Sequence, residues 1–253
     1  MGLMLGPAHC AGGLLAGATV GAFVHPTPEV FAMSCIIGAG AGLIPDLDTR
    51  GTGSRSLGPL GLGINEALST LSRLFFYATK SKYDKAPPHT DGGHRTMTHL
   101  ILFMGAVAAL FYFTAQVPYV LPIWLSVCGV WAVAGLFGSK TKKIGWIGTT
   151  ILTLSIVTGA FVLTQYSEIG KDSIQTLTVA LFAGLVSHYL YDITESGVPW
   201  PLAPLIPIRG QRWFRIKNPL LSASSTLANS VIFSLSIIGA GVMVLEYVGV
   251  RIF

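Results

Sequence analysis

Charged side chains are scarce in this chain. They make up 11% of its 253 residues, whereas a soluble globular domain carries about 25% because it must cover its surface with them. Cysteine is scarce as well, since Cys10, Cys35 and Cys128 lie far apart in apolar stretches. Such a set gives neither a disulfide framework nor a cysteine-based zinc site. With a mean hydropathy of +0.64, the chain is expected to face lipid over much of its surface.

Long apolar segments take the place of charge. A helix needs about 20 mostly apolar residues to cross a bilayer. We expect seven crossing segments, at 3–24, 29–45, 98–116, 119–137, 144–165, 174–194 and 226–249. No Lys or Arg precedes the first, so we expect it to be retained rather than cleaved as a signal peptide. The predicted fold class is all-α, a multi-pass transmembrane helix bundle of about seven spans that forms one integral-membrane domain over residues 1–253.

The basic residues predict how this bundle sits in the membrane. Of the 16 Lys and Arg residues, 14 fall in the loops 46–97, 138–143 and 195–222, which share one side if all seven segments cross. Because basic loops stay in the cytoplasm, the N-terminus and these loops are predicted inside and the C-terminus outside. Topology thus accounts for the net charge of +5, and we expect no nucleic-acid partner.

Two of these loops have features of a membrane surface. Residues 64–77 combine an apolar face with Arg73, which predicts an amphipathic helix lying at the interface; an ordinary helix packed on the bundle is an equal alternative. The loop 195–222 interleaves cations with Trp213 and Phe214, which is typical of anchoring to anionic headgroups. Membrane lipids are therefore the predicted partners. Oligomeric state is not indicated by any pattern.

Small residues recur four apart in the first two segments. They are Gly13, Gly17 and Gly21 in one and Gly38 and Gly42 in the other. This spacing predicts that the two helices pack closely within lipid.

Ionisable side chains gather at the predicted cytoplasmic ends of four segments. An ionisable group beside a membrane segment is costly unless it has a partner or a function. The spans were assigned from apolar length alone, yet they place all of these residues at one depth in the membrane. We therefore favour a single site over a structural polar network. The set consists of His9, Asp46, Asp48, His94, His99, His188 and Asp192.

The local spacing of these residues fits metal binding. His188 and Asp192 are four apart and share one helical face. Asp46 and Asp48 follow Pro45, where an extended backbone would point both the same way. Mixed imidazole and carboxylate ligands favour zinc, with manganese or iron as alternatives. The set suits one or two divalent ions, and a pair of ions is typical of phosphoester hydrolysis.

Three side chains complete the predicted catalytic set. Arg95 lies between two predicted ligands, where it would stabilise the charge of a phosphate or act as one more basic anchor. Asp48 is expected to act in catalysis as well as in metal binding. Thr98 is placed in the catalytic set and is also a candidate cap of the segment that follows, and Thr194 is a candidate to orient a ligand. For both threonines, ordinary helix-end chemistry is an equal alternative. Asp91 and Glu195 flank the motifs as candidate supporting carboxylates or general bases.

The order of these motifs resembles that of the YdjM-like family of LexA-regulated inner-membrane proteins, which are predicted metal-dependent hydrolases. The matching residues are His9, Pro45-Asp46-Leu47-Asp48, His94-Arg95-Thr96-Met97-Thr98-His99, His188 with Asp192, then Thr194, Gly197-Val198 and Pro204. Thr96 stands where the family has Gly, and Leu100 where it has Ser. The His-x-x-x-Asp pattern is also similar to that of zinc-dependent phospholipases C and related nucleases. The resemblance implies this ligand set and phosphodiester chemistry.

The predicted function is a membrane-bound metal-dependent hydrolase. It would act at the cytoplasmic interface on a phosphoester such as a phospholipid headgroup, through water activated by the metal. The alternative is a divalent-metal carrier, or a membrane interaction protein that the metal stabilises. A carrier holds its ligands near the bilayer midplane on broken helices, whereas these ligands lie at predicted helix ends, which favours the enzyme.

Overall fold

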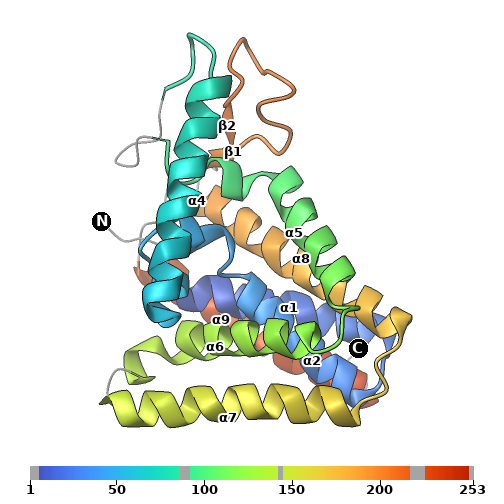
Figure 1. Cartoon of the computed structure of the whole chain (residues 1–253). Coiled ribbons are helices and arrows are strands. Elements are labelled where there is room, and N and C mark those ends of the chain that lie inside the picture. Colours follow the sequence, from blue (N-terminus) through green and yellow to red (C-terminus); the bar gives the residue numbers. More distant parts are fainter. Residues whose placement is uncertain (1–5, 86–91, 142–144, 196, 217–225, 251–253) are drawn as a thin grey trace.

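The computed structural model describes residues 6–85, 92–141, 145–195, 197–216 and 226–250 (Figure 1). These residues form a helical bundle with one two-stranded hairpin at its end. The α-helices are α1 (Gly6–Val24), α2 (Pro28–Ala41), α3 (Thr52–Ser56), α4 (Gly58–Thr79), α5 (Ile101–Thr114), α6 (Val120–Thr141), α7 (Gly145–Tyr166), α8 (Lys171–Glu195) and α9 (Thr226–Tyr247). The shorter elements are the 3-10 helices η1 (Pro45–Asp48) and η2 (Met97–His99) and the antiparallel strands β1 (Val198–Pro199) and β2 (Arg215–Ile216).

The prediction of about seven membrane spans is confirmed. Six segments are long and apolar enough to cross: Gly6–Val24, Pro28–Asp48, Val120–Phe137, Gly148–Tyr166, Lys171–Ile193 and Asn229–Tyr247. These six are the ones found among the described residues; α5, the remaining predicted span, is a helix of only 14 residues, about 21 Å long. Its flanks nevertheless reach both ends of α8, since His99 lies 2.9 Å from Asp192 and Ala115 lines a pocket together with Ile174. The segment around α5 therefore runs along α8 from one end of the bundle to the other.

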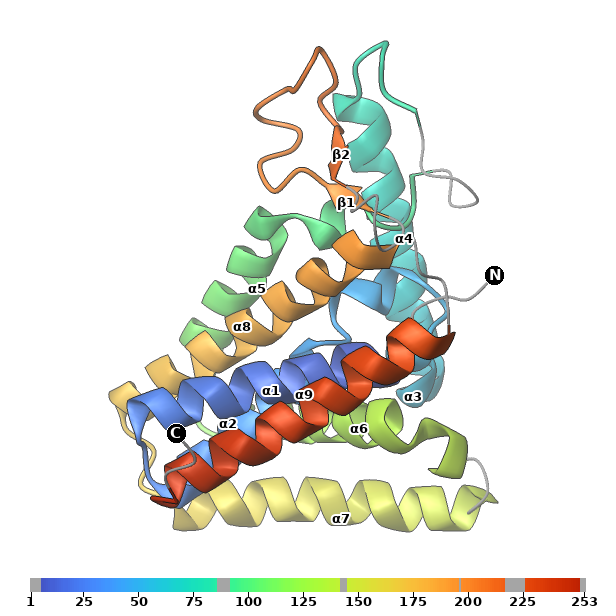
Figure 2. The same cartoon turned by 180° about the vertical axis from the view of Figure 1, so that it is seen from behind.

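The basic loops leave the bundle at one end, which we call the site end. Gly135, near the end of α6, faces Cys10 at the start of α1, so α6 ends and α7 begins at the site end. At the opposite end, the Tyr247 hydroxyl closing α9 donates to the Pro26 carbonyl between α1 and α2, at 2.7 Å. The start of α1 and the end of α9 thus lie at opposite ends, as an odd number of crossings requires (Figure 2).

Glycine allows the central helices to pack closely. A Cβ at Gly13 would clash with the Gly38 carbonyl of α2, and one at Gly42 would clash with the His9 carbonyl. Gly184 brings α8 equally near to Gly38. The predicted close packing of the first two segments is confirmed, and α8 belongs to the same core. This packing brings the start of α1, the end of α2 and the last turns of α8 together at the site end.

Helix α4 lies crosswise to α6 and α7 (Figure 1), as expected for a helix along a membrane surface. It is longer than the predicted 64–77 and also packs on the bundle, because the Asn65 amide donates to the Leu47 carbonyl at 3.0 Å. Leu71 and Leu74 on its outer side are 51% and 61% exposed. The helix therefore has features of both alternatives: it is packed on η1 and keeps an apolar outer stripe.

The β1–β2 hairpin packs beside the end of α4. Asp84 accepts hydrogen bonds from the backbone N–H groups of Ser81, Arg212 and Trp213. The Trp213 indole N–H donates to the Thr79 hydroxyl at 3.0 Å. The loop after α8 is thereby held against the loop after α4, next to the metal-capable residues.

Candidate metal centre

Four segments deliver the seven predicted ligands to one buried cluster at the site end. His9 comes from α1, the two aspartates from η1, and His188 and Asp192 from the last turns of α8. His94 precedes η2, and His99 closes it. The side chains of His9, Asp48, His99, His188 and Asp192 are 0–3% exposed. The prediction that these residues meet in space agrees with the structure.

One detail of the prediction is wrong. Pro45 to Asp48 form a 3-10 turn rather than an extended strand, since the backbone N–H of Thr49 bonds to the Asp46 carbonyl at 3.1 Å. Proline at the first helical position has the φ that such a turn needs and lacks an N–H that would be unpaired there. Asp46 and Asp48 therefore face different partners: Asp46 approaches His188, and Asp48 contacts His94.

Four ligand atoms form the tighter group. Oδ1 of Asp46, Nε2 of His99, Nε2 of His188 and one oxygen of Asp192 all lie within 4.8 Å of one another. His99 and His188 approach Oδ2 of Asp192 at 2.9 and 3.2 Å, and their Nε2 atoms are 3.3 Å apart. Ligands of one tetrahedral zinc ion, bound at about 2.0–2.2 Å, lie a little over 3 Å apart. The separations fit one shared ion.

The hydrogen bonds determine which His99 nitrogen faces the group. The Thr98 hydroxyl donates its only proton to Oδ2 of Asp48 at 2.6 Å. Thr98 must then accept from Nδ1 of His99, 3.0 Å away. Neutral His99 therefore carries a lone pair on Nε2, and that lone pair faces the Asp192 carboxylate. Two acceptors at 2.9 Å repel each other unless a proton or a metal cation relieves the repulsion.

His188 repeats this arrangement. Its Nδ1 lies 2.7 Å from the Gly42 carbonyl, which can only accept a hydrogen bond, so Nδ1 is the donor. When His188 is neutral, its Nε2 lone pair faces Asp46 and Asp192 at 3.6 and 3.2 Å. Two imidazole lone pairs and two carboxylates converge on one buried point. A divalent cation satisfies all four, so the residues present fit a metal ion.

A second group shares His99 with the first and consists of Asp48, His94 and His99. Both oxygens of Asp48 already have partners, because Oδ1 lies 2.7 Å from Nδ1 of His94 and Oδ2 accepts from Thr98. Asp48 thus contacts His94 directly and, through the Thr98 hydroxyl, fixes which nitrogen of His99 carries the proton. This group fits a supporting role beside the four-ligand group.

His9 lies beside the four-ligand group without joining it. Its ring stacks on that of His188, with centroids 3.8 Å apart. Its Nε2 lies 3.6 Å from Oδ1 of Asp192, and its buried Nδ1 has no hydrogen-bond partner among the described residues. The structure thus brings His9 into contact with two ligands, and its own ligation stays a prediction.

Arg95 contacts the cluster from the loop before η2. Its Nη2 donates to Oδ1 of Asp192 at 2.9 Å, and the residue is 6% exposed. Access differs among the members of the cluster. The side chains of Asp46 and His94 are 21% and 11% exposed, and Asp192 is fully buried. The cluster therefore opens toward solvent past Asp46 and His94.

Two residues near the cluster escaped the sequence analysis. Asn65 holds η1 by donating to the carbonyl of Leu47, which lies between the two aspartates. In the sequence, the one sign of this role is that polar Asn65 shares a helical face with apolar Phe76. The sequence pattern predicts that Arg215 anchors the loop to headgroups, whereas in the structure its guanidinium donates to the carbonyls of Arg95 and Gly197. Of the candidate flanking acids, Asp91 lies outside the described residues, and the side chain of Glu195 is not described.

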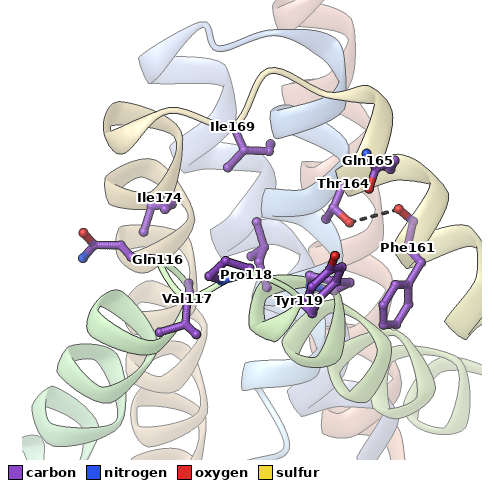
Figure 3. A pocket seen from close by; sticks show the side chains of 12 residues that line it. Gln116, Val117, Pro118, Tyr119, Phe161, Thr164, Gln165, Ile169 and Ile174 are labelled. Atoms are coloured by element: carbon purple, nitrogen blue, oxygen red, sulfur yellow. Dashed lines mark hydrogen bonds between the residues drawn. The ribbon is translucent and has the colours of Figure 1, made fainter.

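A pocket of about 360 Å³ lies away from this cluster, at the opposite end of the bundle (Figure 3). The turn between α5 and α6 borders it, together with the end of α7 and the start of α8. Its polar lining comes from Gln116, Tyr119, Thr164 and Gln165, and the Thr164 hydroxyl is already bonded to the Phe161 carbonyl at 3.1 Å. No His, Cys, Asp or Glu lines it, so it has no metal-capable side chain.

The fold and the cluster together define a class: a multi-pass membrane protein with a buried His and Asp cluster able to hold a metal ion. The family of YdjM inner membrane proteins matches residues 4–252, nearly the whole chain. The chain belongs to this family, and it is an inner membrane protein. No curated protein and no solved structure matches it.

Proposed function

We propose that this protein is a membrane-bound, metal-dependent hydrolase that acts on a phosphoester such as a phospholipid headgroup. The observation that supports it best is the convergence of two imidazole lone pairs and two carboxylates, from Asp46, His99, His188 and Asp192. These residues would hold one ion, and their nitrogen and oxygen donors favour zinc over manganese or iron. A bound divalent ion would polarise a phosphoryl oxygen and make water acidic enough to attack near neutral pH.

His94 and Asp48 form the proton-handling pair of this proposal. Asp48 accepts from Nδ1 of His94 at 2.7 Å, which orients the ring and leaves Nε2 as the atom that takes a proton. His94 is also among the few partly exposed members of the cluster, so a water molecule can reach it. The sequence predicted His94 as a ligand, but its contact with Asp48 suits a general base better.

Arg95 and Thr98 support the reaction in different ways. The Arg95 guanidinium, buried against Asp192, would stabilise negative charge that develops on a phosphoryl group. Thr98 would act through His99, because its hydroxyl keeps Nδ1 protonated and Nε2 free to bind.

The position of the cluster supports a substrate from the membrane surface. All three basic loops leave the bundle at the site end, which by the positive-inside rule faces the cytoplasm. The N-terminus would then be cytoplasmic and the C-terminus outside. Lipid headgroups lie at this depth, and the exposed leucines of α4 lie at the same end.

A metal carrier is the alternative function. Carriers bind their ions near the middle of the bilayer, but here the four ligands come from the short turns η1 and η2 and from the last turns of α8. This placement at helix ends supports the enzyme over the carrier.

Metal content tests the centre directly. The full-length protein is purified in detergent, reconstituted with zinc, freed of excess metal and subjected to elemental analysis. We expect about one equivalent of zinc in the wild type and none in His188→Ala plus Asp192→Ala. The matched control is His25→Ala plus Asp172→Ala, the same residue types exposed at the opposite end, which should keep its metal.

Hydrolysis is then assayed on the metal-loaded protein with phospholipid vesicles. Release of a headgroup by the wild type, and not by the double variant of the ligands, supports the enzyme. Transfer of zinc across proteoliposomes without hydrolysis would establish the carrier instead. Folded wild-type protein that holds no metal after reconstitution would overturn both.

A further inference from the structure

Arg215 reaches back from the hairpin to the metal-capable cluster. The pairing of Pro199 with Arg215 returns the chain to the end of α8. There the guanidinium donates to the Gly197 carbonyl at 2.5 Å through Nη2 and to the Arg95 carbonyl at 3.3 Å through Nη1. Arg215 thereby connects the end of α8 with the loop that carries His94 and Arg95.

The same contact holds Arg95 in an unusual backbone conformation. Arg95 has a φ of 52°, in the left-handed region that is unfavourable for a non-glycine residue. Two contacts compensate for it: Arg215 donates to the Arg95 carbonyl, and the Thr96 hydroxyl donates to the Gly92 carbonyl at 2.8 Å. The result places the Arg95 guanidinium on Asp192. The guanidinium of Arg95 thus contacts the cluster, and that of Arg215 contacts the backbone of Arg95.

Arg215 is a cation whose described hydrogen bonds go to neutral carbonyl groups. Burial and the neighbouring Arg95 charge lower the pKa of Arg215 to about 10, so Arg215 remains protonated near neutral pH. Among the described residues it forms no ion pair with a carboxylate. Arg95 contacts the Asp192 carboxylate, which the proposed ion would also use. An anion bound beside the two arginines would be attracted by both of their charges.

We infer that Arg95 and Arg215 form a subsite that binds the phosphate group of the substrate. A guanidinium has more N–H donors than the two that Arg215 uses on described carbonyls. The donor fork matches the oxygens of a phosphate, and a phosphate carries enough charge to balance both side chains. The inference deepens the proposed function, because it assigns the substrate class to residues other than the metal ligands.

Phosphate binding tests the subsite separately from catalysis. Inorganic phosphate is titrated by calorimetry into full-length, zinc-loaded protein in detergent, and metal content is measured on the same samples. Arg215→Gln should weaken phosphate binding by about tenfold or more, since it removes a charged hydrogen-bond donor, and should keep its zinc. Arg209→Gln is the matched control, an exposed arginine of the same hairpin, and should bind phosphate as the wild type does.

A second variant separates the subsite from a purely structural connection. Arg215→Lys keeps the charge and loses the fork, so its phosphate affinity should lie between those of the wild type and Arg215→Gln. Wild-type phosphate affinity in folded Arg215→Gln, or an equal loss in Arg209→Gln, would overturn the subsite. So would zinc-loaded wild type that binds no phosphate.

The two proposals fail in different ways. Arg215-dependent phosphate binding by protein that holds no zinc after reconstitution would keep the subsite and overturn the metal centre, whereas zinc held without such binding would do the reverse. Titrating dihexanoyl phosphatidic acid in place of inorganic phosphate shows whether the phosphate that binds this subsite belongs to a lipid or to a water-soluble molecule. Tighter binding of the lipid assigns a headgroup, and equal or weaker binding assigns a water-soluble phosphoester.

Discussion

At the scale of single residues, the Thr98 hydroxyl decides which nitrogen of His99 is available. Its proton goes to Asp48, so it accepts from Nδ1 of His99 and leaves Nε2 free toward Asp192. Partners of this kind orient a metal-binding histidine and raise its basicity. A residue that never touches the ion would therefore control its affinity.

Replacing Thr98 tests this control. Thr98→Val keeps the shape and removes the hydroxyl, so we expect zinc affinity to fall by about 10- to 100-fold, measured by competition with a zinc chelator. Thr98→Ser restores a hydroxyl at the same place and should recover most of the affinity. Unchanged affinity in Thr98→Val would show that His99 needs no such partner.

At the scale of the elements, the contact between α1 and α2 positions the cluster. Gly13 and Gly38 let the two backbones approach, and the same contact brings Gly42, which bonds to His188, against the His9 carbonyl. The packing that fills the core thus also sets the distance between α1, α2 and α8 at the site end.

A side chain at Gly13 should separate these helices. In Gly13→Val the new Cβ would clash with the Gly38 carbonyl, and such overpacking costs about 1–3 kcal/mol. We expect a lower apparent unfolding temperature in detergent. Gly241→Val on α9 is the control, because a Cβ there meets nothing within 4 Å; an equal fall in both variants would assign the effect to helix propensity alone.

At the scale of the whole molecule, an odd number of membrane crossings puts the two termini on opposite sides of the membrane. The cluster then lies on the side of the N-terminus and the basic loops. The start of α1 and the end of α9 lie at opposite ends, and the basic loops share the site end. Charge asymmetry of this size orients a bundle with its basic loops in the cytoplasm.

Epitope tags in the full-length chain test this orientation. One is inserted after Lys85 and another, in a separate chain, after Phe253. The tag at the C-terminus should be accessible to antibody in intact spheroplasts, and the tag after Lys85 only after permeabilisation. Accessibility of both tags under the same condition would contradict an odd number of spans.

The sequence by itself determined the features that depend on local composition and period. Apolar length determined the helical bundle, because a backbone in lipid must satisfy its own hydrogen bonds. The spacing of His188 and Asp192 and the placement of the other ionisable residues at segment ends determined most of the candidate site, since their cost in a membrane requires partners. The shared depth of four motifs then followed from the span count.

Only the tertiary structure decided how these residues divide their roles. The 3-10 turn after Pro45 sends Asp46 and Asp48 to different partners, and no pattern of two residues in sequence specifies those partners. Asn65 and Arg215 reach the cluster from a helix and a hairpin whose positions depend on packing between segments far apart in the chain. Local propensity determines which helices form, whereas contacts between those segments determine which polar atoms meet.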